Sequence, residues 1–171
     1  NRARVLFGHS MGAIVGFELA HRLQRRGAPV RGLIVSGCRA PAVEQRDFRS
    51  DQPDHVLVER LRAQGGTPDE LLDHPEFAAL FLPVLRADLR ALEAYRKPPR
   101  PPLDCPIRAF AGELDPEATP DSVADWSRET CASFRLERFP GGHFFPLQSQ
   151  PAVFEALRSA IESFAGGSLP R

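Results

Sequence analysis

Residues 5–20 read VLFGHSMGAIVGFELA, which is an apolar run, then a turn bounded by glycines, then a run with helical spacing. Residues 4–7 are short, apolar and followed by a glycine, which is typical of a buried strand. The predicted helix covers residues 13–25, and its large apolar side chains recur at the spacing of one helix face: Val15, Leu19 and Leu23. Residues 32–36 contain a second apolar run. The chain therefore opens with a β-α-β unit, whose two strands are expected to be parallel.

The middle of the sequence changes character and predicts a helical insertion. Thr67, Pro68 and Glu70 match a capping box with proline at the first helical position. Five large apolar side chains then form a stripe over several turns: Phe77, Phe81, Leu85, Leu89 and Leu92. Residues 97–102, KPPRPP, cannot continue a helix and indicate a stiff extended connector back to the sheet.

The last third of the sequence returns to alternating strand and helix patterns. Residues 106–111 and 134–139 have strand character, and Thr119 with Pro120 opens a helix between them. A final helix is predicted from Pro151, with four large apolar side chains on one face: Phe154, Leu157, Ile161 and Phe164. We therefore expect an α/β protein with a mostly parallel sheet and helices on both faces.

Composition and charge narrow the classes of function. The 171 residues include 22 Lys and Arg and 22 Asp and Glu, so the sequence indicates no basic surface for nucleic acid or anionic lipid. We therefore expect neither nucleic acid nor a membrane as a partner. Three scattered cysteines lack the paired spacing of a zinc or dithiol site, and no run approaches the roughly 18 apolar residues of a membrane span. These patterns favour a reduced, cytoplasmic protein without disulfides.

The turn in residues 8–12, GHSMG, carries the first chemistry. It matches the G-x-S-x-G pattern, and a predicted strand leads into it while a predicted helix leads out, as a nucleophile elbow requires. Gly8 and Gly12 flank Ser10, because a side chain at either position is expected to collide with the adjoining strand and helix. The helix N-terminus directs a partial positive charge at an oxyanion formed there, and the Met11 N–H is the expected donor. The alternative is a glycine-rich turn with an incidental serine.

A serine hydroxyl needs a base, and the candidate is His143. It follows the predicted strand of residues 134–139, directly after the paired glycines of residues 141–142, which let the loop bring an imidazole over the elbow. His9 lies beside the serine but is expected to face the wrong way. The other histidines fall in helical or cap contexts and are interpreted as structural or solvated: His21, His55 and His74. The alternative is that His143 is a loop histidine without a role.

The acid that orients the base is expected after an earlier strand. Residues 112–116, GELDP, stand there, and Asp115 is preferred over Glu113 because Pro116 fixes a turn at the strand end. The chain order serine, acid, histidine is that of α/β-hydrolases. The alternative left open is that these acidic residues only form a solvated turn.

These motifs together resemble one known family. The serine elbow, the GELDP turn, Trp126 and the GGHFF sequence of residues 141–145 are similar to those of the type II thioesterases that serve polyketide and nonribosomal peptide synthesis. The segment LRADLRALEAYR, residues 85–96, is similar to the lid of that family, which other α/β-hydrolases with a GHSMG elbow are not expected to share. The likeness extends over residues 4–164, nearly the whole chain.

The resemblance implies the C-terminal portion of an α/β-hydrolase fold with a helical lid insertion. Residues 1–38 and 103–171 are expected to form the core, and residues 39–102 the lid. The family has several strands before its elbow and a loop that supplies a second oxyanion donor. In this sequence, which starts at Asn1, the predicted strand of residues 4–7 comes first, without those strands or that loop before it. We therefore expect that an N-terminal part is missing, which leaves an apolar strand edge exposed.

The implied activity is hydrolysis of stalled or aberrant acyl groups from the phosphopantetheine arm of acyl or peptidyl carrier proteins. By position, Ser10 is the nucleophile, Asp115 the acid and His143 the base, and the chemistry needs no metal or cofactor. Three apolar lid residues either line an acyl channel or pack within the lid: Phe77, Phe81 and Leu85. The expected protein is a monomer, and four basic residues are candidates for contact with an acidic carrier: Arg86, Arg90, Arg96 and Lys97.

Two other interpretations stay open at this point. A generic serine esterase or lipase shares the triad and differs only in the lid and the acyl pocket. A catalytically impaired fragment that acts as a carrier-binding module keeps the fold without the chemistry.

Overall fold

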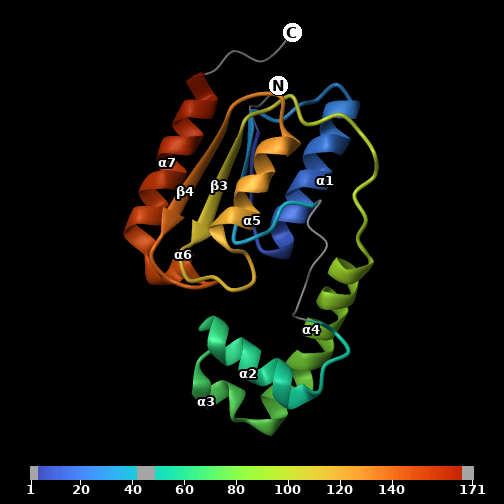
Figure 1. The fold of residues 1–171 in the computed structure, drawn as a ribbon, viewed down its shortest axis with the longest axis vertical. Coiled ribbons are helices and arrows are strands. Elements are labelled where there is room, and N and C mark those ends of the chain that lie inside the picture. Colours follow the sequence, from blue (N-terminus) through green and yellow to red (C-terminus); the bar gives the residue numbers. More distant parts are fainter. Residues whose placement is uncertain (1–3, 42–48, 167–171) are drawn as a thin grey trace.

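The computed structural model describes residues 4–41 and 49–166, which form a sheet covered by helices on both faces and a further group of helices beyond the lower end of the sheet (Figure 1). The strand order is that of the sequence: β1 (Val5–His9), β2 (Gly32–Ser36), β3 (Ile107–Gly112) and β4 (Phe134–Phe139). All three neighbouring pairs are parallel, which confirms the predicted β-α-β start. The carboxyl ends of the strands therefore meet at one edge of the sheet, and the loops that follow them can bring side chains together.

Apolar strand residues point alternately to the two faces of the sheet and build two cores. Five helices belong to this part of the chain: α1 (Met11–Arg25), α5 (Pro120–Ala124), the 3-10 helix η1 (Asp125–Glu129), α6 (Phe145–Gln148) and α7 (Gln150–Gly166). Leu33 and Val35 of β2 are buried in the core that α1, α5 and η1 cover. Ile34, between them, is buried in the core that α6 and α7 cover. Figure 1 shows α7 on the opposite side of the sheet from α1 and α5.

The buried faces of α1 and α7 match the predicted ones only in part: Phe164 is buried as predicted, and Leu23 and Leu157 pack against the cores. In α1 the buried residues are Ala13, Ile14, Gly16, Phe17, Ala20 and His21, and in α7 they are Val153, Ala156, Ala160 and Phe164. Four residues of the predicted stripes are exposed: Val15, Leu19, Phe154 and Ile161. Small residues make up part of both buried faces, so a pattern of large apolar residues alone points to a neighbouring face.

Three helices form a separate apolar cluster: α2 (Asp54–Gln64), α3 (Asp69–Leu72) and α4 (Pro75–Ala94). The predicted capping box is wrong, because α3 begins at Asp69 with Pro68 as its N-cap and without a side-chain cap hydrogen bond. A new helix starts at Pro75, since proline has no N–H to continue the hydrogen bonding of α3. We call residues 49–94 the lid segment; residues 42–48 of the predicted insertion lie outside the described residues.

The connector after α4 has no regular secondary structure, as predicted, and polar contacts tie it to the core. Tyr95 Oη donates to Glu18 Oε1 at 2.5 Å, and Arg100 donates to the same carboxylate. The hydrogen bond from Arg100 is the main reason why the pKa of Glu18 is lowered. Lys97 pairs with the buried Glu129 at 2.7 Å. Within residues 4–41 and 49–166, every helix is too short or too polar to cross a membrane.

Candidate active site

Strand β1 and helix α1 meet at Ser10, whose backbone has φ 53° and ψ −124°. Among the described residues it is the one residue other than glycine with a positive φ. Such a conformation costs about 1–3 kcal/mol and persists only where the surroundings fix it. Here the Ser10 N–H donates to Ser36 O of β2 at 2.8 Å, and Ser10 O accepts from the Ala13 N–H at 3.0 Å. The sequence-predicted turn is therefore a strained strand-to-helix elbow.

The two glycines of the elbow differ in what surrounds them. A Cβ at Gly8 would lie 2.1 Å from Gly12 O and 2.6 Å from Ala13 N, so β1 and α1 cross there with no room for a side chain. A Cβ at Gly12 would meet no atom within 4 Å outside the backbone of its own helix. The prediction that both glycines prevent a collision is therefore confirmed for Gly8 and wrong for Gly12, which faces open space.

A buried acid and the predicted base are in direct contact. Asp115 Oδ2 lies 2.9 Å from His143 Nδ1, and Asp115 Oδ1 accepts hydrogen bonds from the N–H groups of Glu117 and Ala118 at 2.9 and 3.1 Å. Burial alone raises the pKa of Asp115, but the bond to His143 and the two backbone bonds outweigh it, so the pKa lies below its usual range. The structure thus pairs His143 with an ionised Asp115, whereas the Glu113 side chain is exposed.

The loop that carries His143 is held close to the end of β3. Gly141 has φ 116°, and the Gly142 N–H donates to Gln148 Oε1 of α6 at 3.0 Å. A Cβ at Gly112 would lie 2.4 Å from Gly142 O, so only glycine allows the two loops to approach this closely. These contacts fix the imidazole beside the acid.

His9 is a member of the site that the sequence interpretation missed. Its ring centroid lies 5.0 Å from that of His143, and its Nδ1 lies 3.0 Å from Ser36 Oγ. A side chain at Gly37 would come within 2.6 Å of the His9 ring, so this glycine makes room for it. Burial, and then the neighbouring His143, lower the pKa of His9 to about 4, so the ring is neutral near pH 7. His9 does not line the cavity that Ser10 lines, and it packs against the base instead.

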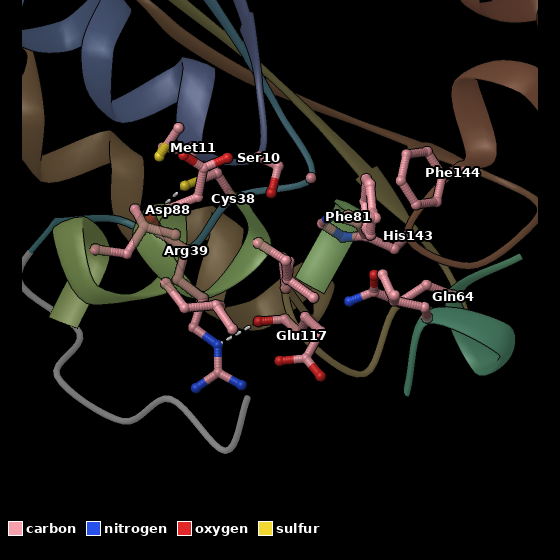
Figure 2. Close-up of a pocket in the computed structure, with 16 residues that line it drawn as sticks. Ser10, Met11, Cys38, Arg39, Gln64, Phe81, Asp88, Glu117, His143 and Phe144 are labelled. Carbon is pink, nitrogen blue, oxygen red and sulfur yellow. Dashed lines mark hydrogen bonds between the residues drawn. The ribbon is translucent and has the colours of Figure 1, made fainter. Parts of the chain in front are cut away.

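A cavity of about 230 Å³ lies between the elbow and the lid segment (Figure 2). The proposed nucleophile, oxyanion donor and base line it together with apolar lid residues: Ser10, Met11, His143, Leu61, Phe81, Leu85 and Leu89. Phe77 is not among the lining residues; its ring stacks on that of Phe81 with the centroids 5.2 Å apart. The cavity therefore brings a hydroxyl, an imidazole and a helix N-terminus to one apolar space, which is a suitable arrangement for acyl transfer.

One residue of the cavity wall joins the acid loop to the lid segment. The backbone N–H of Glu117 donates to Asp115, and its carboxylate pairs with Arg60 of α2 at 2.8 Å. The carbonyl of the same residue accepts a hydrogen bond from Arg39, which Figure 2 shows as a dashed line. Among the described residues, no group of three or more His, Cys, Asp and Glu side chains is arranged to hold a metal ion.

The basic residues predicted to contact a carrier are largely engaged within the chain. Arg86 pairs with Asp54, and Lys97 is held in the ion pair described above. Arg96 donates to the backbone carbonyls of Glu93 in α4 and of Tyr95. Arg90 is exposed. The structure therefore uses most of this set to fix the lid segment and its connector.

The chain matches known proteins along most of its length. A thioesterase-domain family model covers residues 3–161. Thioesterase PikA5 of Streptomyces venezuelae is 41% identical over 140 residues, which are 81% of this chain and 50% of that protein. The solved RedJ thioesterase of the prodiginine pathway of Streptomyces coelicolor is 48% identical, with a TM-score of 0.76 over 82% of this chain and 56% of its own.

A second solved structure is closer in fold. The type II thioesterase BorB of the borrelidin cluster is 38% identical and has a TM-score of 0.82, over 93% of this chain and 65% of its own. The chain spans about half the length of the curated relatives that it matches. The predicted α/β-hydrolase fold is therefore confirmed for the part of the chain that the structure describes.

Proposed function

The chain belongs to the thioesterase family, and on that premise we propose that it hydrolyses acyl groups from the phosphopantetheine arm of acyl or peptidyl carrier proteins. The predicted resemblance to this family is confirmed, whereas the substrate, the carrier partner, a cytoplasmic location and a monomeric state are parts of the proposal. The similarity of this chain to thioesterases of biosynthetic pathways supports a carrier-bound substrate.

One observation carries the proposed chemistry: a buried, ionised Asp115 holds His143 by Nδ1 at 2.9 Å in the wall of the cavity that Ser10 also lines. Because Nδ1 is taken by the acid, Nε2 is the nitrogen that remains for the serine. Ser10 Oγ makes no hydrogen bond within the described residues. Contacts of this kind are commonly long in a free enzyme and tighten when the substrate binds.

In the first half of the reaction, Ser10 Oγ attacks the thioester carbonyl while His143 Nε2 takes the hydroxyl proton. The Met11 N–H at the start of α1 donates to the oxyanion that forms. The carbon–sulfur bond then breaks, the acyl group stays on the serine, and His143 returns the proton to the departing pantetheine sulfur. A thiol has a pKa of about 8.5, so its thiolate leaves more easily than an alkoxide.

In the second half, water replaces the thiol. His143 takes a proton from the water, whose oxygen attacks the acyl-serine carbonyl, and the serine oxygen leaves with that proton. The products are the free acid and the restored Ser10 hydroxyl. Phe81 and Leu85 line the cavity and are proposed to contact the acyl chain, whereas Phe77 is proposed to support Phe81 from behind.

Ser10→Ala tests the function directly. We expect it to lower acyl-pantetheine thioester hydrolysis at least about 10³-fold, without a change in melting temperature, because a serine hydroxyl contributes little packing. Ser159→Ala, at an exposed position of α7, is the matched control and should retain full activity. Full activity of Ser10→Ala would overturn the assignment.

Substrate pairs and a covalent probe separate the rival functions. Faster turnover of an acyl-pantetheine thioester than of the matching oxygen ester supports a thioesterase, and the reverse order indicates a generic esterase. Labelling of Ser10 by a fluorophosphonate shows a reactive nucleophile. A protein that binds the carrier but reacts with neither the probe nor the esters would be the carrier-binding module instead.

A further inference from the structure

Gln64 is a polar residue of the cavity wall to which the mechanism above gives no role. It is the last residue of α2, and only 8% of its surface is exposed. Its side chain lines the cavity, and Figure 2 shows the amide reaching into it from the lid segment, on the side of His143 and Phe144. Within the part of the chain that the structure describes, this amide has no hydrogen-bond partner.

The backbone around Gln64 is fixed, so its amide is held in a defined place. Arg60, one turn earlier on the same face of α2, pairs with Glu117 of the core at 2.8 Å. After the helix ends, a side chain at Gly66 would come within 2.2 Å of the Phe144 ring, so the backbone lies against that ring. The end of α2 is therefore attached to the core on both sides of Gln64.

The groups that surround the Gln64 amide do not take up its hydrogen bonds, so the amide is available to a ligand. Many of the lining residues are large and apolar, among them Leu61, Phe81, Leu85, Leu89 and Phe144, and Asp88 is the acidic residue that the lid segment contributes. The acidic group that the core contributes to the cavity wall, Glu117, is already paired with Arg60. A buried amide that has no partner in the protein takes one from water or from a bound molecule, because leaving it unpaired is unfavourable.

We propose that Gln64 determines the acyl selectivity of the site by hydrogen bonding a carbonyl, hydroxyl or amino group on the acyl chain. This inference rests on the proposed thioesterase function. When a plain alkyl chain fills the cavity, it displaces the water and leaves the amide unpaired. When the chain carries a polar substituent, the amide is paired again. The site therefore favours substituted acyl groups over alkyl groups of equal length, by about 10- to 100-fold in kcat/KM.

The test compares two acyl thioesters of equal length, 3-hydroxybutanoyl and butanoyl N-acetylcysteamine, with wild type and Gln64→Met. Methionine has nearly the shape of glutamine without its hydrogen-bonding groups. We expect Gln64→Met to remove most of the wild-type preference for the hydroxyacyl substrate. Gln150→Met, at the exposed start of α7, is the matched control and should leave the preference unchanged.

Gln64→Glu gives a second measurement if the methionine variant folds poorly. A carboxylate accepts hydrogen bonds but does not donate them, so this variant should keep activity on the 3-hydroxybutanoyl thioester and lose activity on the 3-oxobutanoyl thioester. Melting curves of all variants show whether a change in rate reflects folding.

The other outcomes overturn the proposal. An unchanged preference in both variants, or an equal loss on alkyl and hydroxyacyl substrates, would mean that Gln64 only packs. A loss that disappears when the thiol portion lacks an amide, as in ethanethiol esters, would assign the contact to the pantetheine arm. If wild type hydrolyses none of these thioesters but is labelled at Ser10 by the fluorophosphonate, the proposed function fails rather than this inference alone.

Discussion

Gly8→Ala and Gly12→Ala are predicted to have opposite effects, although the two glycines flank the same serine. A methyl group at Gly8 would lie 2.1 Å from Gly12 O, 2.4 Å from Gly12 C and 2.6 Å from Ala13 N. Ordinary contacts between such atoms are about 3.5 Å, so β1 and α1 must separate by about 1 Å or more. All three atoms belong to the backbone, so no side-chain rotation relieves the clash.

Separating β1 from α1 displaces Ser10, because this residue joins the two elements. A displacement of about 1 Å at the nucleophile costs on the order of 10²-fold in turnover, and forced overpacking costs about 1–3 kcal/mol of the free energy of unfolding. Gly12→Ala meets no atom within 4 Å outside its helix, and alanine in a helix is more favourable than glycine by up to about 1 kcal/mol. It should leave turnover near wild type and raise the melting temperature slightly.

Acyl-thioester turnover and urea unfolding, measured on both variants, decide the question. The two substitutions are chemically identical and four residues apart, so each serves as the control for the other. Equal losses in both variants, or wild-type turnover in Gly8→Ala, would refute the crossing geometry of β1 and α1.

Three further predictions concern the acid, the lid segment and His9. Asp115→Asn should lower turnover by up to about 10⁴-fold, because the imidazole loses the carboxylate that orients it. Glu113→Gln should keep turnover near wild type, and a large loss in that variant would assign the acid to Glu113 instead. Phe81→Ala should change the preferred acyl length in a series of thioesters, whereas Phe77→Ala should only lower the melting temperature; a similar change in both would contradict the cavity boundary. Because burial and the neighbouring imidazole lower the pKa of His9 to about 4, the unfolded chain binds a proton there at a higher pH than the folded chain. The stability that the neutral His9 ring contributes is therefore complete above about pH 6.5 and is lost as the pH falls toward 4. Urea unfolding at pH 7 and 4.5 measures this loss, and in His9→Asn the drop in the free energy of unfolding between the two pH values should be smaller by up to about 3 kcal/mol. An unchanged pH dependence would count against a buried neutral ring.

The elements that sequence predicts well are those whose signals are local. The strands β2 and β4 have the predicted bounds, because short apolar runs between turn residues leave few alternatives. The elbow follows from five consecutive residues that must combine a tight turn with a helix start. The residues that pair at the site, Asp115 and His143, each follow a recognisable strand, so the parallel sheet brings their loops to the same edge.

Other features depend on contacts between distant segments. The faces of α1 and α7 that meet the sheet contain Ala13, Ala20 and Ala160, and residues this small do not stand out in a hydrophobic pattern. The packing of His9 against the base requires a gap at Gly37, which is far away in the sequence. The amide of Gln64 reaches the cavity only because the end of α2 lies against the loops that carry Glu117 and Phe144, and no periodicity in the sequence encodes that position.

The threefold use of Glu117 limits how this protein can be re-engineered. Exchanging the lid segment for that of a relative is an obvious route to a different acyl preference, but such a graft also replaces Arg60. The Glu117 carboxylate would then lose its partner while its own N–H still holds Asp115. A functional chimera therefore has to transplant positions 60 and 117 as a matched pair, even though they lie in different modules of the fold.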